Sequence, residues 1–198
     1  MNKRLLAALL TFAIMPVFAQ ETAINNAELL AHLQQVKIDT ELPLAQLSAF
    51  MKQMNEQYSE GYKEIENATR ELYNIVAESV SSDIDHIFNE LCNQMIPLKD
   101  MNFQNNSIDA FEHLFKDNFI DTHKQEIESI LNKYSKNDPN FQEKSTWPLE
   151  KRIIDYFFTS GDSLAIVMMV TAQEICTSIL NKIDAKIAEL ACHSKPLA

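Results

Sequence analysis

Apolar residues recur every three or four positions along most of the chain, with polar residues between them. Between residues 43 and 95 this pattern forms one continuous stripe, which is typical of an amphipathic helix. An unbroken helix of that length would reach about 80 Å, longer than a globular domain of this mass. We therefore predict a long helix over 43–95 that is broken or bent. Gly61 and the 79–82 region are its weak points, and Ser81-Ser82 is the favoured position.

The same spacing predicts further helices before and after this stripe. A short helix capped by Asn25 or Asn26 should end before Pro43, because a residue that precedes proline avoids the α region. Short helices follow between residues 107 and 159, and Gly161 is expected to end the last of them. A long helix over 162–192 begins with the apolar run 164–170 (LAIVMMV), which should lie at the centre of the core. The predicted fold is an all-α, single-domain helical bundle or array in which helix 43–95 packs against helix 162–192.

The first 19 residues have the features of a secretory signal peptide. Lys3 and Arg4 precede an apolar run over 5–15, and Ala19 supplies a small residue at the predicted cleavage site, between Ala19 and Gln20. The run is shorter than the roughly 20 residues that a membrane-spanning helix needs. We therefore expect a bacterial periplasmic or secreted protein whose mature form, residues 20–198, is one all-helical domain that does not span a membrane.

Composition narrows the classes of partner. The chain has 17 Lys and Arg against 28 Asp and Glu, and removal of Lys3 and Arg4 with the leader takes the net charge from −11 to −13. Such a surface repels phosphate backbones, so nucleic acid is not an expected partner. Only two glycines are present, 100 positions apart, which excludes glycine-rich phosphate loops. The expected partner is another protein.

Three cysteines would enter an oxidising compartment, so at least one of them has no partner within the chain. Cys176 and Cys192 lie 16 residues apart on one predicted helix, a separation of about 24 Å that no disulfide spans. Cys92 is therefore required for any bridge within the chain. Cys92–Cys192 is the favoured pair, Cys92–Cys176 is the alternative, and the absence of any bridge remains open.

Few residues form a pattern that indicates chemistry. His86 lies on the same predicted helix face as Asp83 and Glu90, and His113 lies four positions before Asp117, but exposed helices commonly contain such pairs. We therefore predict no catalytic residues, no metal and no cofactor. Tyr58 and Tyr62 flank Gly61 one turn apart; they are expected in the core, with an interaction surface as the alternative.

These features favour an exported, non-enzymatic helical protein that acts by protein–protein contact in the bacterial envelope. An inhibitor of the immunity type or a chaperone-like factor fits that description, and an acidic inhibitor would be steered toward a basic target. The main alternative is a helical carrier of a small apolar ligand or a metal, which requires a cavity lined by residues 164–170. The third is an enzyme, which requires a cleft where carboxylates converge on His86 or His113.

Overall fold

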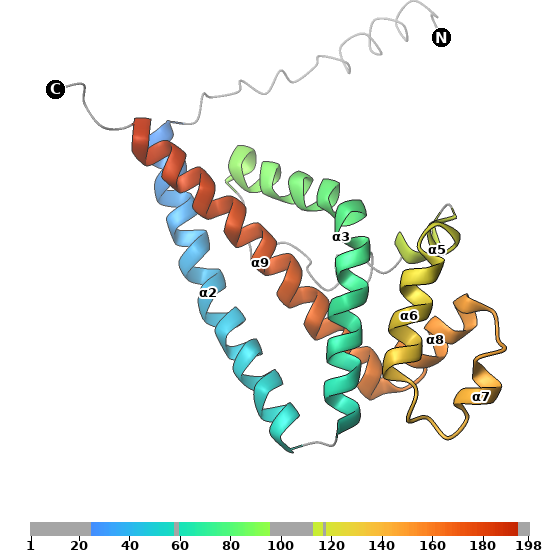
Figure 1. The fold of residues 1–198 in the computed structure, drawn as a ribbon. Helices are drawn as coiled ribbons and strands as arrows, with labels where there is room; N and C mark the ends of the chain where they lie inside the picture. The colour runs from blue at the N-terminus through green and yellow to red at the C-terminus, as the bar shows by residue number, and fades with distance from the viewer. Residues whose placement is uncertain (1–24, 58–59, 96–112, 117, 194–198) are drawn as a thin grey trace, which may run out of the picture.

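The computed structural model describes residues 25–57, 60–95, 113–116 and 118–193 (Figure 1). These residues form an all-helical bundle, as predicted. The helices are α2 (Asn26–Gln57), α3 (Glu60–Gln94), the 3-10 helix η2 (His113–Phe115), α5 (Phe119–Thr122), α6 (Lys124–Tyr134), α7 (Phe141–Lys144), α8 (Leu149–Phe158) and α9 (Gly161–His193). Three long helices, α2, α3 and α9, pack against one another, and the short helices lie together beside α3 and the start of α9.

The predicted boundary at Pro43 is wrong, because α2 runs through this proline from Asn26 to Gln57. Proline has no N–H, so it cannot bond the carbonyl of Asp39, and its ring crowds the preceding turn. Packing outweighs that cost: α2 buries Leu33 and Val36 before the proline and Met51 after it. The predicted start is confirmed, since the backbone N–H of Ala27 donates to Asn25 Oδ1 at 3.0 Å.

The stripe over 43–95 is therefore shared between two helices. The stretch that separates α2 from α3, residues 58–59, lies outside the described residues and includes Tyr58. Gly61 occupies the first turn of α3, beside this change of helix. Ser81 and Ser82 stay helical, and Figure 1 shows α3 changing direction between its turquoise and its green part. The helix thus bends rather than breaks, as expected where serines cluster.

Helix α9 is the central element of the core, and its bounds agree with the predicted helix over 162–192. It packs against α2, α3 and α8, and Figure 1 shows it running diagonally from the start of α2 past α3. Ile166, Val167 and Val170 of the apolar run are buried, whereas Leu164 is 38% exposed. One hydrophobic cluster links α2, α3, η2, α5, α6, α8 and α9.

Gly161 does not end the preceding helix, as its sequence context suggested. It is the first residue of α9, and neither it nor any other described glycine has a positive φ. Ser160 supplies the cap instead, because its Oγ accepts the backbone N–H of Ser163 at 3.0 Å. A helix start thus replaces the predicted helix stop.

Candidate interaction site

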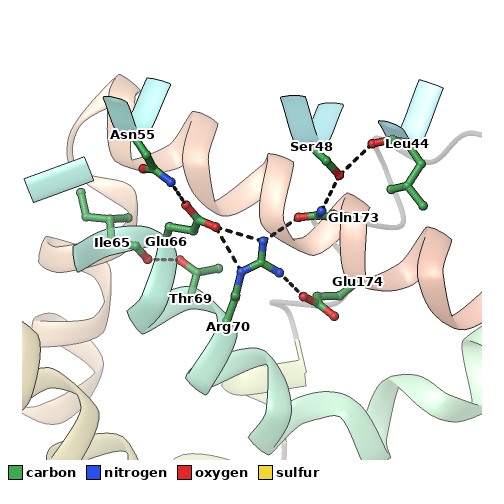
Figure 2. A network of polar contacts seen from close by, with 9 residues as sticks. All are labelled: Leu44, Ser48, Asn55, Ile65, Glu66, Thr69, Arg70, Gln173 and Glu174. Atoms are coloured by element: carbon green, nitrogen blue, oxygen red, sulfur yellow. Dashed lines mark hydrogen bonds and ion pairs between the residues drawn. The ribbon is translucent and has the colours of Figure 1, made fainter. Parts of the chain in front are cut away.

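A network of polar side chains joins the three long helices, with Arg70 of α3 at its centre (Figure 2). Arg70 Nε and Nη2 donate to Glu66 Oε1 at 3.2 and 3.0 Å, and Nη1 donates to Glu174. Nη2 also donates to Gln173 Oε1 at 2.6 Å. Glu66 and Arg70 are four residues apart, so they share one face of α3, whereas Gln173 and Glu174 come from α9.

The network also reaches α2. Asn55 Nδ2 donates to Glu66 Oε2, and Gln173 Nε2 donates to Ser48 Oγ at 2.8 Å. The Ser48 hydroxyl in turn donates to the Leu44 carbonyl at 2.9 Å. The side chain of Glu66 is only 16% exposed, so its carboxylate depends on these donors. The arrangement fixes the relative positions of α2, α3 and α9.

An open groove of about 340 Å³ lies over this network. Ser48, Met51, Lys52, Asn55 and Glu56 of α2 line it together with Lys63, Glu66 and Arg70 of α3 and Gln173 of α9. Lys52, Lys63 and Glu56 are exposed and make no hydrogen bond or ion pair with any described residue. The groove therefore combines fixed polar groups with free charged side chains of both signs.

Of the two tyrosines considered as an interaction surface, only Tyr62 can be placed. Its side chain is partly buried and packs against the cluster formed by Met51, Ile166 and Val170. Tyr58 lies outside the described residues. Tyr62 is therefore part of the core packing, which was the favoured interpretation.

The structure contains no disulfide among the three cysteines, so both predicted pairings, Cys92–Cys192 and Cys92–Cys176, are absent. Cys92 lies near Lys186, whose charge lowers the pKa of the thiol, although burial has the larger effect and raises it. Burial also raises the pKa of Cys176, to about 11, whereas Cys192 is exposed near the end of α9. All three thiols are free in the structure.

The two histidines considered as candidate ligands, His86 and His113, form isolated pairs. His113 Nε2 lies 2.9 Å from Asp83 Oδ2, which ties η2 to α3, and His86 is 75% exposed and 3.8 Å from Glu90. Asp117, the other predicted neighbour of His113, lies outside the described residues. Within the part of the chain that the structure describes, no group of three or more His, Cys, Asp or Glu side chains is arranged to hold a metal.

The apolar run 164–170 is packed by side chains. Ile166 and Val170 contact Met51, and Leu47, Ile65 and Met169 close around them. By length and composition alone, α9 (161–192) is also the one described helix that could cross a membrane. In the structure it is a core helix between α2, α3 and α8.

The outer face of α2 is a second surface of interest. Ile38 and Leu42 are 61% and 64% exposed, and Phe50 is also exposed. Figure 1 shows α2 along the outer edge of the three long helices. Among the described residues, the other exposed large apolar side chains, Phe115, Ile154 and Leu164, lie on three different helices.

Sequence reasoning missed the groove and its network. The spacing of Glu66 and Arg70 was a visible signal, but it is common on helices. The cross-helix partners Asn55, Gln173 and Glu174 have no signature in the sequence. No family model, curated protein or solved structure matches this chain.

Proposed function

We propose that this chain is an exported, non-enzymatic protein of the bacterial envelope that acts by protein–protein contact through the groove between α2, α3 and α9. The observation that carries the proposal is the pairing of fixed and free charges in this groove. Glu66 and Arg70 hold each other on its floor, whereas Lys52, Lys63 and Glu56 have no partner among the described residues. Charged side chains around a rigid floor suit the polar rim of a protein interface.

The groove is better suited to binding than to catalysis. No histidine or cysteine lines it, and the Ser48 hydroxyl is bonded to the Leu44 carbonyl rather than to a base. Glu66 accepts hydrogen bonds from Arg70 and Asn55, which hold its carboxylate in place. A carrier function is less favoured, because the buried part of the 164–170 run, Ile166 and Val170, packs against Met51 and its neighbours.

The acidic surface would contribute at longer range. Net charge steers the encounter with a basic partner, whereas contacts within a Debye length of about 8 Å decide the bound pose. An inhibitor of the immunity type or a chaperone-like factor would use both the long-range attraction and the short-range contacts. Lys52 and Lys63 would then donate hydrogen bonds to carboxylates of the partner at the contact itself.

Affinity capture from envelope extracts tests this function. The wild-type protein should capture a partner that mass spectrometry identifies repeatedly and that salt weakens. The double variant Lys52→Glu/Lys63→Glu should lose it. The matched control Lys124→Glu/Lys136→Glu reverses two exposed lysines on and after α6 and has the same net charge, so it should retain the partner. Repeated captures without a partner, or equal capture by both variants, would contradict the proposal.

A further inference from the structure

The outer face of α2 presents four apolar residues in one line. Ile38, Leu42, Ala45 and Ala49 are all exposed, and their spacing of four, three and four positions keeps them on one side of the helix. Leu33 and Val36 face the core from the opposite side. Thus α2 has two apolar faces, of which the described residues cover only one.

The order of these four residues is self-complementary. Their spacing is the same read from either end, while the large side chains stand at one end and the small ones at the other. An antiparallel second copy would place Ile38 opposite Ala49 and Leu42 opposite Ala45, twice each. Alternation of large and small side chains across an interface gives close packing, and a two-fold interface needs one surface to complement itself.

We propose that the protein forms an antiparallel homodimer through this face of α2, with the two-fold axis between Leu42 and Ala45. The spacing matches the four-three repeat by which two helices interlock along a seam. Lys52 and Glu56, which line the groove, lie beyond the C-terminal end of this four-residue seam. The variants at Leu42 and Ala45 used below leave the groove lining unchanged, so they test the dimer separately from the function proposed above.

Charge is consistent with a second copy as the occupant. A chain with a net charge of −11 would bring acids together in most contacts with itself. Here the positions that flank the seam are largely uncharged, and they include Gln34, Gln35, Gln46 and Gln53. In the proposed register Lys52 faces Gln35, and the flanking pairs are Asp39 with Gln46 and Glu41 with Ser48. No like charges meet along the helix.

The dimer should be weak. The line from Ile38 to Ala49 is about 17 Å long, and each copy contributes only two large apolar side chains. A standard interface buries about 800 Å² on each partner, and this contact falls at the low end of that scale. We therefore expect a dissociation constant in the micromolar range.

Sedimentation velocity and light scattering on the purified protein test the dimer. A concentration range of about 1 to 300 μM covers the expected micromolar dissociation constant. The wild-type protein should convert from monomer to dimer over this range. Leu42→Glu should weaken the dimer about 30-fold or more, as loss of a central contact does. Ile154→Glu is the matched control, because Ile154 is an exposed apolar residue on α8, and it should dimerise as the wild type does. Because both positions are exposed, circular dichroism should show unchanged helicity.

Mixing two variants tests the register. Leu42→Lys and Ala45→Glu should each dimerise poorly alone, whereas an equimolar mixture should form a heterodimer in which the new lysine meets the new glutamate. A wild-type protein that stays monomeric at the highest concentration overturns the proposal. So does a dimer that Leu42→Glu leaves intact, or a mixture that associates no better than its components. Binding of a foreign protein to this face by a monomeric chain would also overturn it.

Discussion

Replacement of Arg70 by methionine should destabilise the fold well beyond the loss of an ordinary surface ion pair. Arg70 donates to Glu66, Glu174 and Gln173, and its own side chain is 33% exposed. Methionine keeps the length and helix propensity but leaves two partly buried carboxylates without a cation. Removal of one member of a fully buried pair costs about 3–5 kcal/mol. Discounted for exposure, we expect about 2–3 kcal/mol in the free energy of unfolding.

Urea unfolding followed by circular dichroism measures this cost, and the melting temperature should fall by about 5–10 °C. Lys182→Met is the matched control, because Lys182 also joins α9 to α3, through Asp85 at 2.6 Å, but at an exposed site. It should cost less than about 1 kcal/mol. The charge change Glu66→Gln should destabilise the wild type and stabilise the Arg70→Met background. Equal costs for Arg70→Met and Lys182→Met, or the same effect of Glu66→Gln in both backgrounds, would refute the reasoning.

Three further predictions concern single side chains. Burial raises the pKa of Tyr73 from 10.0 to about 12, and this effect is larger than the opposite effect of a hydrogen bond to Ser178. Because the folded state holds this proton more tightly than the unfolded state, stability that is present below pH 10 should be lost as the pH rises toward 12. Tyr73→Phe should make this step smaller in a pH series of urea melts, leaving the contribution of Tyr134 and Tyr156, whose pKa values burial also raises. A step of unchanged size in the variant would count against the assignment. Alkylation by iodoacetamide at pH 8, followed by peptide mass spectrometry, should modify exposed Cys192 first and Cys176 last, because burial raises the pKa of Cys176 to about 11. Pro43→Ala should stabilise the protein by about 1–2 kcal/mol in urea melts, because the helix regains a backbone hydrogen bond. The greater entropy of the unfolded chain without proline offsets part of this gain. A loss of stability would indicate that α2 does not continue through residue 43.

Periodicity predicted the helices well where each helix has one apolar face. The bounds of α9 agree to within a residue or two, and Ile166, Val167 and Val170 are buried as expected. At Pro43 the rule that a helix ends before proline failed. The rule considers only the free energy of one helical turn, whereas packing along the whole length of α2 determines whether the helix continues. Burial of Leu33, Val36 and Met51 on either side of the proline exceeds the roughly 3 kcal/mol that proline costs in a helix.

The candidate site was hidden from sequence for a different reason. Glu66 and Arg70 are ordinary neighbours on one helix, and they become a half-buried network only when Gln173 and Glu174 arrive from α9, more than 100 positions away. The outer face of α2 was hidden in the same way, because Ile38 and Leu42 satisfy the apolar pattern as well as Leu33 and Val36 do. Periodicity predicts that a residue lies on an apolar face, but a helix with two such faces needs two partners. The described part of the fold supplies one of them for α2, and the proposed antiparallel second copy would supply the other.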